Sequence, residues 1–192
     1  HILWTGMPFC NIVSVCPDLI DRTIVLNGVS KVYSMTGWRI GYAGGPKSLI
    51  AAMKKIQSQC TSNPTSISQV AAEAALNGDQ SCIYPMVRAF KERHDWVVEQ
   101  LNQIAGVHCI RSQGTFYSFP NFSGAIAARP DIKNDVDMAE YLLQEIGVAL
   151  VPGSAFGAEG YLRLSFATSI KNLQEALKRL QQLLGKNPIK NK

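Results

Sequence analysis

Apolar side chains recur along this chain at two spacings, one typical of helices and the other of strands. After Pro46 they recur at intervals of three and four residues, which predicts a helix with one buried face. These positions are Leu49, Ile50, Met53 and Ile56. A second helix is expected over 66–76, where the pair Asn77-Gly78 is a stop signal.

The longest predicted helix begins at Pro85. At about 1.5 Å per residue it spans roughly 30 Å, which is long enough to connect two domains. Its apolar stripe consists of Met86, Phe90, Val97, Leu101 and Ile104. We place a domain boundary inside this helix, so that one domain covers residues 1–97 and the other covers 98–192.

Short apolar runs predict strands in two separate parts of the chain. The first two are expected at 23–26 and 40–43, with Asn27-Gly28 as a turn after the first. Further strands are expected at 107–110, 116–119, 148–151 and 161–166. Helices over 135–146, with Asp135 as the expected cap, and from Ser169 onward complete an α/β order. The last helix has an apolar side made of Leu173, Leu177, Leu180 and Leu184.

Composition agrees with a soluble globular protein. Hydrophobic residues make up 46% of the chain and charged residues 17%, and no apolar run is long enough to cross a bilayer. The first residues lack the basic and apolar regions of a signal peptide. Five scattered cysteines without CxxC pairs are expected to be reduced thiols of a cytoplasmic protein, and no metal site is expected.

The formal net charge of +5 raises the question of nucleic-acid binding. A nucleic-acid surface would gather Lys and Arg with stacking aromatic residues on one element. Here the basic residues are dispersed, and only 186–192 is locally cationic, which we interpret as a solvated end. The sequence therefore predicts neither a nucleic-acid partner nor a membrane partner.

Candidate chemistry lies between the first two predicted strands, where Lys31 stands eight positions before Arg39. A lysine amine that has lost its proton can form a Schiff base with an aldehyde, and a neighbouring cation or partial burial promotes that loss. An arginine holds phosphate oxygens through paired, charge-assisted hydrogen bonds. The pair suits an aldehyde that carries a phosphate, and pyridoxal 5'-phosphate (PLP) is such a molecule.

Residues 30–42 read Ser-Lys-x3-Met-Thr-Gly-Trp-Arg-Ile-Gly-Tyr and resemble the cofactor-lysine signature of the class I/II PLP-dependent aminotransferases. The likeness is greatest to the bacterial aspartate aminotransferase branch. It continues in the family's order through 61–66, 114–117, 152–157 and 161–167. Five blocks in order, covering most of the chain, are highly specific.

The resemblance implies fold type I, in which a large α/β domain binds PLP and a smaller α/β domain follows, with active sites shared in a homodimer. Members of this family are much longer than 192 residues. The chain is therefore expected to be a C-terminal portion, with the end of the large domain and the whole small domain. The aspartate that pairs with the PLP ring nitrogen and a glycine-rich phosphate turn would lie in the other half. We expect little transaminase activity from the chain alone.

The resemblance also assigns roles to individual residues. Lys31 would carry PLP and then move a proton as general base and acid, while Arg39 would hold the phosphate. In the predicted strand 161–166, period-two alternation places Arg163 on the face opposite Leu162 and Leu164. The family uses the arginine of this segment to bind the α-carboxylate of the substrate, an amino acid or a 2-oxo acid. Phe116 is expected near the substrate.

Several interpretations stay open. Gly28 and Ser58 replace a phosphate-binding serine and a dicarboxylate-binding arginine of some relatives, so aspartate specificity is not established. Ser62-Asn63 is either an ordinary turn or a loop that reaches a neighbouring subunit. Tyr117 and Phe156, like Phe116, are core aromatics or lie near the substrate. The alternative functions are a PLP-dependent carbon–sulfur lyase and a folded fragment without catalysis.

Overall fold

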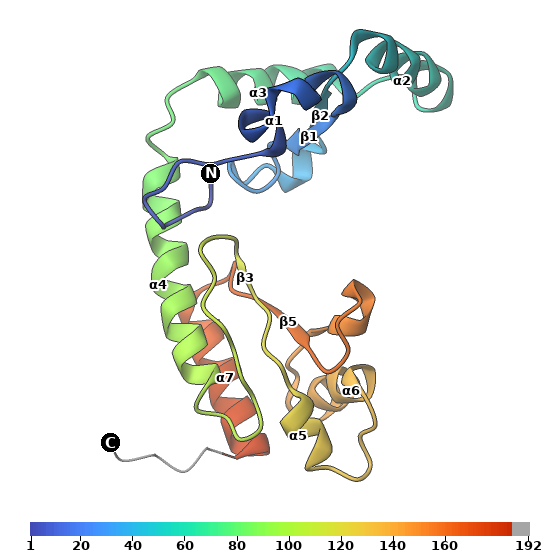
Figure 1. Cartoon of the computed structure of the whole chain (residues 1–192). Coiled ribbons are helices and arrows are strands. Elements are labelled where there is room, and N and C mark those ends of the chain that lie inside the picture. The colour runs from blue at the N-terminus through green and yellow to red at the C-terminus, as the bar shows by residue number, and fades with distance from the viewer. Residues whose placement is uncertain (186–192) are drawn as a thin grey trace. The chain divides into compact units, whose positions relative to one another are not determined.

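The computed structural model describes residues 1–185 and divides the chain into two units. The first unit comprises His1 and Gly6–Met86, and the second comprises Ile2–Thr5 and the chain from Val87 onward. The division falls within the long helix α4 (Ile83–Leu101), the helix in which the sequence analysis places a boundary (Figure 1). That boundary at residue 97 stays a prediction.

The first unit is built around a short antiparallel pair of strands. Val25 pairs with Gly44 at one end and Gly28 with Gly41 at the other. The expected turn at Asn27-Gly28 is wrong, because both residues belong to the first strand. A Cβ at Gly28 would lie 3.1 Å from the carbonyl oxygen of Ile40, so glycine serves close strand approach here. The elements of this unit are α1 (Ile12–Val15), η1 (Pro17–Arg22), β1 (Val25–Gly28), η2 (Thr36–Trp38), β2 (Gly41–Gly44), α2 (Lys47–Cys60) and α3 (Ser66–Asn77).

Helices α2 and α3 confirm the predicted helical period, but the expectation that α2 buries its apolar side is wrong. Leu49, Met53 and Ile56 are 44%, 40% and 66% exposed. Ile50, the fourth apolar position, is only partly buried, so within residues 1–185 most of this side of α2 is uncovered. The spacing of apolar residues shows that one face of α2 is suited to burial, but it does not show which other element would pack against that face.

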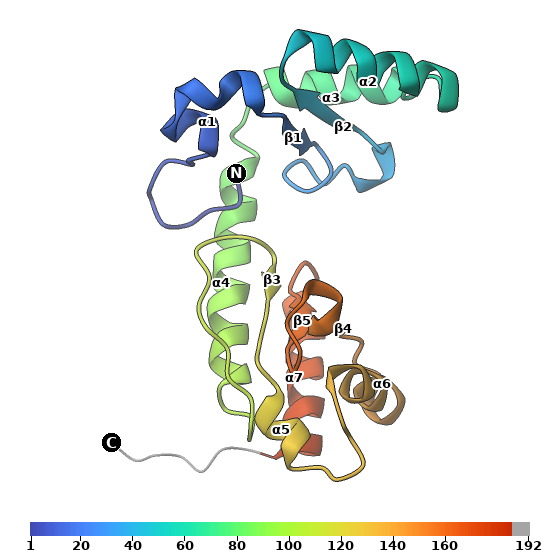
Figure 2. The same cartoon turned by 45° about the vertical axis from the view of Figure 1, so that its right-hand side comes forward.

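The second unit contains a three-stranded antiparallel sheet in the order β3-β5-β4. Figures 1 and 2 show α4 and α7 running side by side, and the Gln181 side-chain amide donates to the Gln100 backbone carbonyl across them. The elements after α4 are β3 (Tyr117–Ser118), α5 (Ser123–Ala127), α6 (Asp135–Ile146), β4 (Val151–Pro152), η3 (Gly153–Phe156), β5 (Leu162–Ser165) and α7 (Ile170–Leu184).

The alternation along β5 is confirmed. Leu162, Leu164 and Phe166 are buried, whereas Arg163 lies half-buried on the other face. The four leucines predicted for the last helix are buried as well, and all of these side chains belong to one core. This core also contains Val97, Leu101, Ile104, Phe122, Met138 and Leu142.

Three local expectations in this unit are wrong. Residues 107–110 form no strand, because the Asn102 side chain takes both backbone groups of Cys109, with N···O distances of 2.9 Å each, and leaves only a bridge between His108 and Asn121. Helix α4 begins at Ile83, two residues before the expected start. The cap of α6 is Asn134, whose side chain accepts hydrogen bonds from two backbone N–H groups of the first turn, and Asp135 is the first helical residue.

Residues 2–5 pack with the second unit although they stand at the beginning of the chain. Leu3 forms a β-bridge with Gly114, and the Trp4 indole donates to the Ser112 carbonyl at 3.1 Å. The Trp4 ring lies 5.0 Å from the ring of His94, which is buried in α4. The Nε2 atom of His94 accepts the Ser112 N–H, so its Nδ1 carries the proton.

Adjacent leucines on α6 allow the core of this unit to be tested. Leu142 is fully buried and Leu143 is 54% exposed. Leu142→Ala is expected to lower the free energy of unfolding by about 2–5 kcal/mol, because it removes buried methyl groups and leaves a cavity. Leu143→Ala makes the same chemical change in the same helix and should alter it by about 0.5 kcal/mol at most.

Urea denaturation followed by tryptophan fluorescence measures both leucine variants. A Trp38→Phe background leaves Trp4 and Trp96, which both belong to the second unit. Equal effects of the two alanine substitutions would contradict the core as described.

Candidate functional site

The connection between β1 and β2 carries Lys31 and Arg39. It is anchored at Val29, Met35 and Ile40, whose side chains are buried in a small cluster with Ala72 of α3. The Lys31 carbonyl accepts the Ser34 N–H in a turn, and the Lys31 side chain is exposed. The expected position of both charges between two strands is confirmed. Buried apolar residues fix the backbone on both sides of each charge.

Tyr33 fastens the lysine turn to the end of α3. Its hydroxyl donates to Oε1 of Gln80 at 2.8 Å, and the Gln80 amide in turn donates to the carbonyls of Ala75 and Gly78 at the helix end. Desolvation and the nearby Tyr42 and Cys82 raise the pKa of Tyr33, against the effect of its bond to Gln80. The hydroxyl therefore stays a hydrogen-bond donor at neutral pH.

Arg39 has a left-handed backbone, with φ of 56° and ψ of 44°. Ser34, in the same connection, also has a positive φ of 55°. Residues other than glycine adopt this conformation at a cost of about 1–3 kcal/mol, and such strain is concentrated at functional sites. The Nη1 atom of Arg39 donates to the Thr36 carbonyl at 3.0 Å, which directs the exposed guanidinium.

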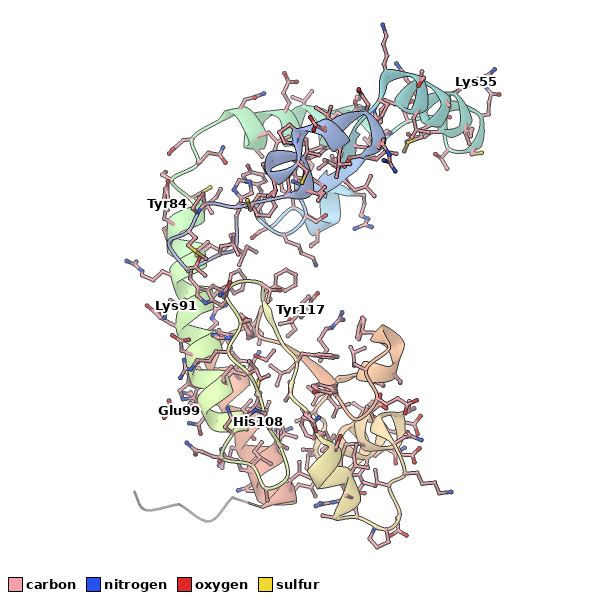
Figure 3. All side chains as sticks on the ribbon, viewed as in Figure 1. Lys55, Tyr84, Lys91, Glu99, His108 and Tyr117 are labelled. Carbon is pink, nitrogen blue, oxygen red and sulfur yellow. The ribbon has the colours of Figure 1, made fainter. Side chains whose placement is uncertain are left out.

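Arg163 of β5 lies between two aromatic rings of the second unit. Its Cζ atom is 4.4 Å from the ring centre of Tyr117 and 4.7 Å from that of Phe156. Figure 3 shows Tyr117 on β3, pointing away from α4. The guanidinium forms no hydrogen bond or ion pair with any residue of 1–185. Cation–π contacts hold the faces of the guanidinium and leave its N–H edge for an anion.

Phe116 lies beside this arrangement and packs inward. Its ring is 6.2 Å from that of Phe90 and 4.2 Å from that of Tyr117, and its carbonyl accepts the Phe166 N–H at 3.0 Å. Tyr117, the next residue along β3, contacts Arg163. The role of Phe116 near a substrate stays a prediction.

Comparison with known proteins identifies the family. The model of the family "Aminotransferase class I and II" matches residues 5–180. The chain belongs to this family. A curated member, the aspartate/prephenate aminotransferase of Nitrosomonas europaea, is 59% identical over 96% of this chain. The aspartate aminotransferase of Rhizobium meliloti is 48% identical over 94% of it.

Solved structures of aminotransferases have the same fold. The crystal structure of the aspartate aminotransferase from Rhizobium meliloti superposes with a TM-score of 0.87 at 47% identity and covers 94% of this chain and 46% of that one. The aromatic aminotransferase from Pyrococcus horikoshii gives 0.86 at 34% identity, covering 96% and 48%. The chain spans about half the length of the curated relatives it matches, 48% and 45% for the two named above.

Within this class I and II aminotransferase chain, the structure groups the predicted residues by unit. Lys31 and Arg39 share one connection of the first unit. Arg163 meets Tyr117 and Phe156 in the second. Ser58 is exposed on α2, where its hydroxyl donates to the Lys55 carbonyl.

The segment that contains Ser62 and Asn63 is a turn between α2 and α3. Ser62 has a positive φ of 64°, and the Asn63 amide donates to the carbonyl of Pro64 at 2.9 Å. This geometry agrees with the ordinary turn, one of the two interpretations of this segment. It does not test a contact with a neighbouring subunit.

Sequence reasoning missed one buried acid of the second unit. Asp135, expected only as a helix cap, is 1% exposed, and its carboxylate accepts N–H groups from Ser154 and Gly160 at 2.8 and 3.3 Å. The signal was the run Asn134-Asp135-x-Asp137, which offers more capping side chains than one helix needs.

The cysteines, the possible metal ligands and the helix lengths of residues 1–185 complete the description of the site residues. All five cysteines carry free thiols, as expected, and burial raises the pKa of Cys109 to about 11. No group of three or more His, Cys, Asp or Glu side chains that could hold a metal ion occurs among residues 1–185. Of the helices described, none combines the length and apolar character needed to span a membrane.

Proposed function

We propose that this chain supplies Lys31, Arg39 and Arg163 to a PLP-dependent aminotransferase that moves an amino group from an amino acid to a 2-oxo acid. The observation that carries the proposal is Arg163, half-buried between two aromatic rings with its N–H edge available to an anion. A planar donor held in this way suits the carboxylate that amino acids and 2-oxo acids share.

The residues of the β1–β2 connection fit PLP by their chemistry. Lys31 is an exposed primary amine, which an aldehyde requires, and Arg39 offers a guanidinium for a phosphate. The hydrogen bond from Arg39 to Thr36 and the left-handed backbone fix that donor before any ligand binds. When bound, PLP supplies an electron sink for the pair of electrons left on the substrate's α-carbon.

Each residue of the chain then has a distinct task. Lys31 would hold the cofactor and, once its amine is released, would act as general base on the substrate's α-carbon and as general acid toward the cofactor. Arg163 binds and orients the substrate carboxylate. Arg39 neutralises phosphate charge. Phe116 is proposed to lie near the substrate, on the inner side of Tyr117.

We extend the proposal to the assembly and its substrates. The uncovered apolar side of α2 supports a homodimer, since such a face is normally buried. Free thiols support a cytoplasmic enzyme. The names of the two relatives make aspartate the first amino donor to test and prephenate the first acceptor. We would test 2-oxoglutarate as a second 2-oxo acid.

The test is covalent labelling of the lysine. The 192-residue chain is titrated with PLP and reduced with borohydride, and the labelled peptides are mapped by mass spectrometry. We expect an adduct on Lys31 that saturates at low PLP concentration and is lost in Lys31→Ala. Lys55, exposed on α2 (Figure 3), is the matched control lysine, and Lys55→Ala should leave the labelling unchanged. Scattered labelling of surface lysines at the same PLP concentration would contradict the assignment.

A further inference from the structure

Asp135 controls the shape of the loop that follows β4. Its two carboxylate oxygens accept the N–H of Ser154, at the beginning of the loop, and of Gly160, near its end. The loop is also closed by the Gly153 N–H, which donates to the Tyr161 carbonyl at 2.7 Å. A Cβ at Gly153 would collide with the Ala158 carbonyl, so the loop is packed tightly upon itself.

The charge of Asp135 suits this task. The carboxyl is 1% exposed and lies at the first turn of α6, where the helix dipole favours an anion. Burial pushes the pKa of Asp135 upward, but the hydrogen bonds from Ser154 and Gly160 outweigh it, and the pKa lies below its ordinary value. The side chain is therefore an ionised acceptor at neutral pH, and hydrogen bonds to an ionised acceptor are the strong ones.

This loop carries Phe156, one of the two aromatic residues on Arg163. Phe156 is 51% exposed, so little packing of its own holds it in place. Its ring stands edge-on to that of Phe119 at 6.1 Å and lies 4.7 Å from the Arg163 Cζ. The position of the Phe156 ring thus depends on the backbone of 153–160, which the Asp135 carboxylate holds through its hydrogen bonds to Ser154 and Gly160.

We infer that Asp135 is a positioning residue for the substrate carboxylate, acting through the loop and Phe156 on Arg163. The inference rests on the proposed function for the role of Arg163. Without the carboxylate, the loop loses two charge-assisted hydrogen bonds, Phe156 leaves Arg163, and the guanidinium samples orientations that do not match a carboxylate.

The test uses nuclear magnetic resonance on the ¹⁵N-labelled 192-residue chain. Asp135→Asn keeps the size of the side chain but turns an N–H toward one of the two loop amides. We expect the nuclear Overhauser signals that report contact between Phe156 and Arg163 to be lost. We also expect succinate, titrated while the Arg163 Nε signal is followed, to bind about tenfold more weakly, as for one lost charge-assisted hydrogen bond. Asp137→Asn is the matched control. It removes a charge from the same helix turn and one backbone hydrogen bond, from Lys133, and it should change neither readout.

A double-variant comparison separates positioning from general destabilisation. In an Arg163→Ala background, Asp135→Asn should leave the remaining succinate affinity unchanged, because its effect on binding requires Arg163. If Asp135 only stabilised the fold, Asp135→Asn would weaken succinate binding whether or not Arg163 is present. Intact Phe156–Arg163 contacts in Asp135→Asn would overturn the inference. If the unsubstituted chain does not bind succinate, the role proposed for Arg163 fails, and the contact signals alone still decide the role of Asp135.

Discussion

Lys31→Ala is expected to reduce amino transfer by at least roughly 10³-fold, because one substitution removes both the amine that holds the cofactor and the base that moves the α-proton. The assay needs a chain of full family length. We would join this chain to the part of the Nitrosomonas europaea relative that it does not span, since the two are 59% identical where they match. Transfer from aspartate to 2-oxoglutarate is then followed by coupled spectrophotometry.

Two further variants of the same chimera show what the lysine does. Lys31→Arg keeps the positive charge but cannot lose its proton, so it should be as inactive as the alanine variant. Lys55→Ala should keep the parent rate. Appreciable transfer by Lys31→Arg would mean that charge alone suffices and that Lys31 is not the acid–base residue. A folded parent chimera without activity would count against the proposed function itself.

Arg163→Ala is expected to lower kcat/KM for aspartate by about 10²–10³-fold, with most of the change in KM. The estimate corresponds to the loss of two charge-assisted hydrogen bonds to a carboxylate. Arg163→Lys should still be impaired by about tenfold or more, because an ammonium cannot form the paired bonds of the planar fork. Steady-state kinetics on the same chimera measures both variants.

The control for Arg163 is an arginine with an ordinary surface partner. Arg111 is exposed and pairs with Asp95 at 3.0 Å, so Arg111→Lys should leave kcat/KM unchanged. PLP labelling of Lys31 should also be normal in every Arg163 variant, because Arg163 is assigned to the substrate and not to the cofactor. An Arg163→Lys enzyme with parental KM would rule out paired recognition of the carboxylate.

The periodicity of apolar residues predicts which segments form helices and strands, but it does not predict whether their apolar faces are buried. The spacing of leucines in α7 and the alternation in β5 predict burial correctly, because the residues that cover these faces belong to the same chain. The same kind of spacing in α2 misleads, since most of the apolar side of that helix is uncovered within the described residues. The spacing of apolar residues shows which face of an element is suited to burial. Whether that face is buried depends on other parts of the protein.

Side-chain competition for backbone groups explains the other misses. The Asn102 amide replaces a strand partner at Cys109, and Asn134 takes the capping position that Asp135 was expected to hold. In each case a polar side chain takes backbone groups that the sequence pattern assigns to another partner. The family motif located Lys31, Arg39 and Arg163, but the contact of Arg163 with Phe156 requires a loop closed from a distant helix, which no local pattern contains.

The packing of residues 2–5 makes the first unit an insertion within the sequence of the second. The polypeptide enters the second unit at Ile2, leaves it after Thr5 and returns to it at Val87, so the body of the first unit, Gly6–Met86, is bonded at both ends to residues of the second unit. After a protease cut between Met86 and Val87, the first unit would stay attached only through the noncovalent packing of residues 2–5 on the second unit. A gene that starts at Val87 would encode the second unit without the Trp4 ring that lies against the buried His94. Excising this unit therefore calls for a circular permutation that restores residues 2–5, and simple truncation does not achieve it.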